Sequence, residues 1–166
     1  MRNNIIDIQR ELSNWLSNAK KIAIVGVGNR SRKDDFIGIK VARELKKVIS
    51  SRRVVILDCG TIPENYIDII EKFEPSHILV IDAAQIGLEP GDLMLVDSKK
   101  IYGLTLSTHN LPLNIFADYL KKVAGAKIAL LAIQPDKIEY EIGLTKKLRY
   151  TANELTEVLL KVLSRK

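Results

Sequence analysis

Three side chains that could bind a divalent metal ion follow separate predicted strands and loops. Asp35 ends a polar loop after the first apolar strand, Asp82 ends a later strand, and His109 lies in a loop before a predicted helix. If the two strands run parallel, their carboxyl ends meet at one edge of a sheet and the three groups lie together. Two carboxylates and an imidazole suit zinc, nickel or a similar ion and leave coordination positions open for water or substrate. The residues therefore suggest a three-ligand metal site.

Each of these residues also has an ordinary structural interpretation. Asp35 and its neighbour Asp34 could cap the following helix, Asp82 could hydrogen-bond a turn, and His109 could be a capping residue of its loop. Taken singly, these structural interpretations are favoured. His77 begins an apolar strand, where an imidazole bonded to backbone is commoner than a ligand, so it is left out of the predicted site. Four further polar residues at predicted element ends are weaker candidates: Asn29, Glu64, Gln134 and Asp136.

The glycines of the first loop raise a nucleotide-binding alternative. Gly26, Gly28 and Ser31 form G-x-G-x-x-S, which resembles a dinucleotide fingerprint but lacks its third glycine. The acidic pair at 34–35 would meet a phosphate with like charge, although three basic residues at 30–33 could offset it. Nucleotide binding is therefore a minor alternative.

Hydrophobic periodicity predicts the elements that would position these groups. Apolar residues at spacings of three and four predict helices, and short apolar runs rich in β-branched residues predict buried strands. The turn sequence Glu89-Pro90-Gly91-Asp92 precedes a strand that can return antiparallel to its neighbour. The predicted fold is a single α/β domain over 1–166, a three-layer α/β/α sandwich with a twisted, mostly parallel sheet carrying one antiparallel strand. Its predicted helices cover 4–19, 37–50, 64–73, 111–124 and 148–163, and its strands 22–27, 53–58, 77–82, 93–96 and 127–134.

Composition excludes several classes of function. The 166 residues are 46% hydrophobic and 28% charged, with a net charge of +6, which is typical of a globular domain. The basic residues are spread out and aromatic residues make up only 5%, so a nucleic-acid partner is not expected, although an acidic protein partner would be attracted. The lack of a membrane-spanning run or a signal peptide predicts a cytoplasmic protein without membrane insertion. The single Cys59 cannot form an internal disulfide, and as a nucleophile it would need an activating base.

Five short blocks, in order along 21–136, carry a resemblance to a known family. They resemble the nickel-iron hydrogenase maturation endopeptidases, and the later blocks look most like the branch that processes the large subunit of hydrogenase 3 or formate-hydrogenlyase-type enzymes. The blocks are Gly26-Val27-Gly28-Asn29 with Asp34-Asp35, Asp58-Cys59-Gly60-Thr61-Ile62-Pro63-Glu64-Asn65, Ile81-Asp82-Ala83, Ser107-Thr108-His109-Asn110-Leu111-Pro112-Leu113 and Ile133-Gln134-Pro135-Asp136.

The resemblance implies a function and a set of site residues. It implies that Asp35, Asp82 and His109 match the metal-contacting and catalytic residues of the family. The metal there is nickel already bound by the substrate, a hydrogenase large-subunit precursor, from which the enzyme removes a short C-terminal extension. No organic cofactor is implied. The helix at 4–19 looks like an addition to the minimal domain of the family.

The resemblance also implies a recognition loop and leaves the mechanism open. The loop with Asp58, Gly60 and Thr61 is similar to one that helps to recognise the precursor. The nickel could polarise the carbonyl or acidify water, or it could only position the precursor while a carboxylate acts as general base. A different class of function is a non-catalytic binder that inspects the nickel-loaded precursor without cutting it.

Overall fold

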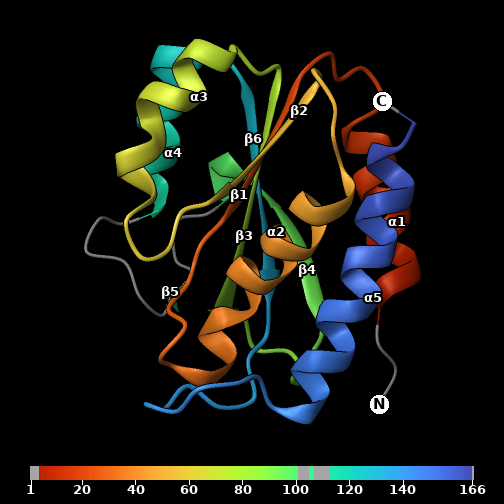
Figure 1. The fold of residues 1–166 in the computed structure, drawn as a ribbon, viewed down its shortest axis with the longest axis vertical. Helices are drawn as coiled ribbons and strands as arrows, with labels where there is room; N and C mark the ends of the chain where they lie inside the picture. The colour runs from red at the N-terminus through yellow and green to blue at the C-terminus, as the bar shows by residue number, and fades with distance from the viewer. Residues whose placement is uncertain (1–3, 101–104, 107–112, 166) are drawn as a thin grey trace.

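A twisted central sheet lies between two layers of helices (Figure 1) in the computed structural model, which describes residues 4–100, 105–106 and 113–165. The strand order is β2-β1-β3-β6-β4, and β5 pairs with β3 off this path. Strands β1 (Ile22–Gly26), β2 (Val54–Asp58), β3 (His77–Gln85) and β6 (Lys127–Ile133) run parallel, whereas β4 (Leu93–Asp97) is antiparallel to β6. The predicted fold class and antiparallel strand are confirmed.

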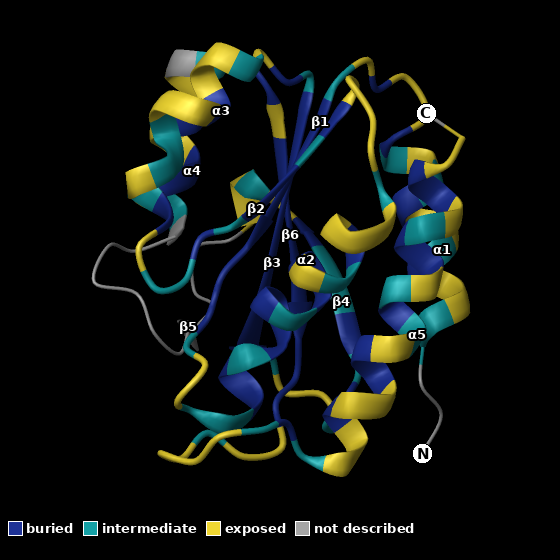
Figure 2. Ribbon diagram, viewed as in Figure 1, coloured by how far each residue is buried: buried dark blue, intermediate teal, exposed yellow. Residues whose placement is uncertain are grey.

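Side chains alternate between the two faces of the sheet and build a hydrophobic cluster on each. Ile24 and Leu79 pack under α1 (Ile5–Trp15), α2 (Ile37–Val48) and α5 (Lys146–Leu163). Val25 and Val80 point to the other face, towards α3 (Ile67–Phe73) and α4 (Leu113–Ala124). Because both faces are covered, the central strands read as continuous apolar runs. Figure 2 shows the buried strands between helices whose outer faces are exposed.

The boundaries of three elements near the predicted site differ from the sequence-based expectation. Short 3-10 turns at Lys33–Phe36 and Pro63–Tyr66 precede α2 and α3. Strand β3 continues to Gln85 because its last residues gain a partner in β5 (Thr105–Leu106), which is antiparallel to it. Asp82 therefore lies within a strand, paired with Ala132, and not at the carboxyl end of one.

The first helix is part of the core. Ile8, Leu12 and Leu16 have at most 1% of their surface exposed and belong to the cluster under α5. Asn4 adds backbone contacts, since its side chain accepts a hydrogen bond from Leu93 N and donates one to Leu93 O. No helix in the described part of the chain combines the length and hydrophobicity of a membrane span.

The first turn of α2 packs directly on the ends of the central strands. A Cβ atom at Gly38 would lie 2.2 Å from Ile81 O and 2.4 Å from Val27 O. Substitution of glycine by alanine normally favours a helix, but here it would force backbone atoms apart. We expect Gly38→Ala to lower the free energy of unfolding by about 1–3 kcal/mol, as for overpacked sites generally. Urea denaturation measures this change, and an unchanged or higher midpoint would contradict such close packing.

Candidate active site

The loop after β1 folds back over the carboxyl edge of the sheet. Val27 N donates to Ile81 O at 3.0 Å, Gly28 N donates to Gly60 O at 2.9 Å, and Asn29 N donates to Asp35 O at 3.2 Å. A Cβ atom at Gly28 would lie 1.9 Å from Asp35 O, so only glycine fits. The backbone of Asp35 occupies the space above the glycine turn that a phosphate would need. The geometry thus favours a close-packed loop over the nucleotide-binding alternative.

Asp34 fastens this loop to a distant segment. Its carboxylate is fully buried and accepts hydrogen bonds from the backbone N–H groups of Asp136 and Lys137 at 2.9 Å and of Thr145 at 2.8 Å. The Thr145 hydroxyl donates to the same carboxylate at 2.9 Å. The N-cap residues of the 3-10 turn and of α2 are Arg32 and Phe36, so neither Asp34 nor Asp35 occupies the predicted capping position. Asp34 holds the loop and leaves Asp35 as the candidate ligand.

Asp35 and Asp82 are buried carboxylates at the same edge of the sheet. Both have 0% of their surface exposed. The turn that carries Asp35 packs against β3, and the alternation of β3 places Asp82 on the face of Val80 and Ala84, towards α3 and α4. The third predicted ligand, His109, lies outside the described residues. Within those residues no group of three acidic, histidine or cysteine side chains has a metal-binding arrangement.

The loop after β2 lies against the first loop. Cys59 N donates to Gly26 O at 2.9 Å, and Gly60 O accepts the bond from Gly28. Asp58 shapes this loop: it accepts a hydrogen bond from Gly60 N at 3.3 Å and an ion-paired one from Arg43 Nε of α2 at 2.7 Å. A Cβ atom at Gly60 would meet nothing within 4 Å, so this backbone faces open space. The predicted recognition residues Asp58, Gly60 and half-buried Thr61 therefore form one loop beside the first.

Glu64 is a stronger candidate than the sequence indicated. It is the second residue of the 3-10 turn after this loop, and its Oε2 is buried without a hydrogen-bond partner among the described residues. A buried carboxylate oxygen without a donor is costly, so a donor from a bound molecule would stabilise it. Sequence reasoning ranked Glu64 low because a polar residue at an element end commonly serves a turn. Its burial could not be read from that position.

Other polar candidates have structural roles. His77 is 2% exposed and lies at the amino end of β3. Its ring meets the Trp15 ring edge-on, with the two ring centroids 5.0 Å apart, and its Nδ1 lies 3.0 Å from Ser76 Oγ. It is remote from the carboxyl edge, in agreement with its omission from the site. Gln134 accepts a hydrogen bond from Ile86 N at 2.9 Å and donates to Gln85 Oε1 at 2.9 Å, which fixes the segment after β3.

Cys59 is unsuited to nucleophilic catalysis. Its side chain is 4% exposed, and burial, reinforced by the Asp58 charge, raises the pKa of its thiol to about 12. At neutral pH it is therefore a protonated, inert thiol. Burial favours the protonated thiol in the folded state. As the pH rises above the ordinary thiol pKa towards 12, the thiol of the unfolded chain ionises first, so the free energy of unfolding falls.

This gives a testable expectation for Cys59. Cys59→Ala should keep the activity of the wild type, and the native wild-type thiol should resist maleimide at pH 7 until denaturant is added. The difference in unfolding free energy between wild type and Cys59→Ala should be constant below about pH 8 and shift in favour of the variant above about pH 9. Rapid labelling of the native protein would contradict the burial.

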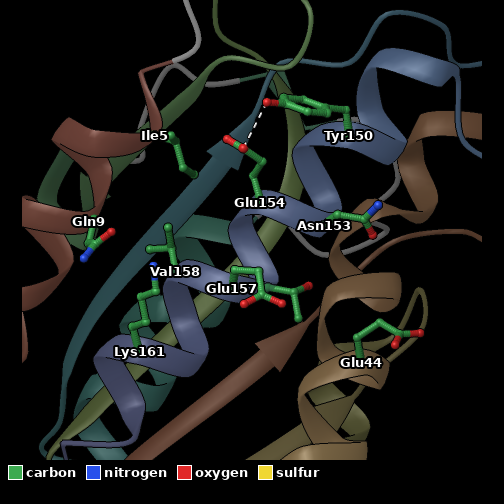
Figure 3. A pocket seen from close by; sticks show the side chains of 10 residues that line it. Ile5, Gln9, Glu44, Tyr150, Asn153, Glu154, Glu157, Val158 and Lys161 are labelled. Carbon is green, nitrogen blue, oxygen red and sulfur yellow. Dashed lines mark hydrogen bonds between the residues drawn. The ribbon is translucent and has the colours of Figure 1, made fainter.

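The cavity of about 590 Å³ between α1, α2 and α5 lies apart from these loops (Figure 3). Glu44 and Lys161 line it, and Tyr150 Oη donates to Glu154 Oε1 at 3.0 Å. None of the predicted site residues lines it. The candidate site is therefore the carboxyl edge and not this hollow in the helical layer.

Comparison with known proteins decides the family. A family model described as hydrogenase maturation protease matches residues 39–162. The chain belongs to the hydrogenase maturation protease family. This protease is 32% identical to a putative hydrogenase maturation protease of Methanocaldococcus jannaschii over 155 residues, covering 89% of this chain and 91% of that protein. It is 35% identical to the hydrogenase 3 maturation protease of Escherichia coli K12 over 124 residues, covering 74% and 78%.

Solved structures agree with this assignment. The crystal structure of the [NiFe] hydrogenase maturation protease HycI from Thermococcus kodakarensis KOD1 superposes with a TM-score of 0.87 at 34% identity, over 93% of this chain and 99% of that one. The protein is thus a hydrolase that acts on peptide bonds, as its resemblance implied, and the purely non-catalytic alternative is not supported.

Proposed function

We propose that this protease removes a short C-terminal extension from the nickel-loaded large-subunit precursor of a nickel-iron hydrogenase of the hydrogenase 3 type. Its relatedness to the Escherichia coli hydrogenase 3 maturation protease supports the substrate class. We place the reaction in the cytoplasm. The nickel is part of the substrate, and the protease itself carries no organic cofactor.

The observation that carries the site is the burial of Asp35 and Asp82 at one edge of the sheet. Both carboxylates have 0% exposure, and removal from bulk water strengthens the attraction of a carboxylate for a bound cation. Oxygen ligands together with an imidazole fit nickel, and His109 is the imidazole that the sequence provides. We propose that these three side chains contact the nickel of the precursor.

The same residues would perform the hydrolysis. Cleavage of a peptide bond needs an activated water, stabilisation of the oxyanion and a proton for the leaving amine. One buried carboxylate would take the proton of the water, and nickel would polarise the carbonyl or hold the precursor in place. The backbone of Gly60, which faces open space, would contact the precursor beside Asp58 and Thr61.

Incubation of the purified protease with nickel-loaded precursor tests this proposal. Intact-mass spectrometry should show loss of a C-terminal fragment from the nickel-loaded precursor and none from the nickel-free precursor. A precursor that keeps its full mass at equimolar protease would overturn the proposed substrate. Cleavage of the nickel-free precursor would overturn only the proposed role of the metal, and the proposed substrate would stand.

A further inference from the structure

The loop at 136–145, between β6 and α5, carries two strongly exposed hydrophobic side chains. Tyr140 is 86% exposed and Ile142 is 71% exposed, the highest values for large hydrophobic residues in the described part of the chain. In Figures 1 and 2 this loop extends past the strands beside the first loop, and its tip is exposed. Isolated exposed hydrophobic residues are common, but two on one projecting loop suggest a contact surface.

This loop is held firmly in spite of its exposure. Both of its ends bind the buried Asp34 carboxylate, through Asp136 and Lys137 at the start and Thr145 at the end. Its middle is joined to the first loop, since Lys33 N donates to Glu141 O at 2.8 Å. A loop that is already ordered loses little entropy when it binds a partner.

Charged side chains of the first loop contact the exposed tip of the 136–145 loop. The Arg32 guanidinium lies 5.5 Å from the centre of the Tyr140 ring, and Lys33 Nζ forms an ion pair with Glu141 at 3.0 Å. Tyrosine and arginine are enriched where proteins bind one another, because each combines an apolar surface with hydrogen-bonding groups. The surface therefore has the composition of a protein contact.

We propose that Tyr140 and Ile142 dock the folded body of the hydrogenase precursor, an inference that rests on the proposed function. A projecting loop suits a macromolecule, because small molecules bind in concave pockets. The loop lies against the loop that carries Asp35, since Lys33 N donates to Glu141 O and Asp34, which binds both ends of the 136–145 loop, is next to Asp35 in the sequence. A precursor seated on the tip would thus present its extension to the same edge of the sheet.

The dissociation constant of the nickel-loaded precursor tests this inference directly. The double variant Tyr140→Ser with Ile142→Ser should weaken binding at least tenfold and raise the KM of processing by a similar factor. The matched control is Ile6→Ser with Val48→Ser, since these side chains are 67% and 66% exposed but lie on α1 and at the end of α2. The control should bind as the wild type does.

Each outcome separates docking from the proposed reaction. Equal affinity of the wild type and the double variant would overturn the docking surface even if both process the precursor. If the wild type binds the precursor tenfold more tightly than the double variant but does not cleave it, the docking surface is supported and the proposed reaction is overturned. A wild-type dimer in sedimentation that the double variant converts to a monomer would instead assign the tip to a second copy of this chain.

A single reactive cysteine provides a second test. Native Cys59 is buried and should not react with maleimide. Ile142→Cys therefore introduces a thiol at the tip of the loop that maleimide can label selectively. A bulky maleimide on this thiol should block precursor binding, whereas the same label on Val48→Cys should have no effect. Full binding by the labelled Ile142→Cys protein would overturn the inference.

Discussion

Asp82→Asn is expected to lower the rate of precursor processing by at least about 100-fold, because an amide is a poor metal ligand and a poor base beside a carboxylate. The variant keeps the size of a fully buried side chain, so the fold should survive the change. Asp35→Asn and His109→Ala should have the same effect on processing. Mass spectrometry of the precursor measures the rate.

The control for these variants removes a charge far from the candidate site and from the 136–145 loop. Glu11→Gln changes an exposed residue of α1 and should process the precursor at the wild-type rate. Circular dichroism and thermal unfolding establish whether Asp82→Asn is folded. If the buried amide unfolds the protein, Asp82→Glu, which keeps the charge, is the variant to test in its place. Full processing by folded Asp82→Asn or Asp35→Asn protein would refute the shared site.

Asp34→Ala is expected to have the largest effect on stability, a loss of about 3–5 kcal/mol. The substitution removes the acceptor of three backbone N–H groups and of the Thr145 hydroxyl in a fully buried position. Urea denaturation measures the loss. Asp136→Ala is the matched control, since that residue is exposed and its N–H remains; it should change stability by at most about 0.5 kcal/mol. Wild-type stability of Asp34→Ala would contradict the structural role of Asp34.

The sequence predicted the layers of this fold and the packing of the turn with Asp35 near β3, the strand that carries Asp82. Buried strands and amphipathic helices have strong periodic signals, so each predicted strand and helix appears in the described chain with ends shifted by a few residues. Strand β5 was missed because two residues carry no periodicity. The extension of β3 to Gln85 was missed with it, since Ala84 and Gln85 pair with β5.

The neighbouring carboxylates show where sequence reasoning ends. Asp34 and Asp35 have the same side chain and lie next to each other, and the sequence offered a capping role for both. The structure instead joins Asp34 to donors that lie 102 to 111 residues away. No local pattern reveals a buried contact over such a distance. The exposure of Tyr140 is equally a product of tertiary structure.

The link from Asp34 to Thr145 has a consequence for the order in which the protein matures. Asp34 is near the start of the chain, but its acceptor oxygens find their donors only after β6 and the loop that follows it have been made. Contacts between such distant segments form late, because closing a long chain segment costs entropy before the contact repays it. The loop that carries Asp35 would therefore stay unfastened during synthesis. An incomplete chain would lack a formed site, and only the finished protein could engage a metal-loaded precursor.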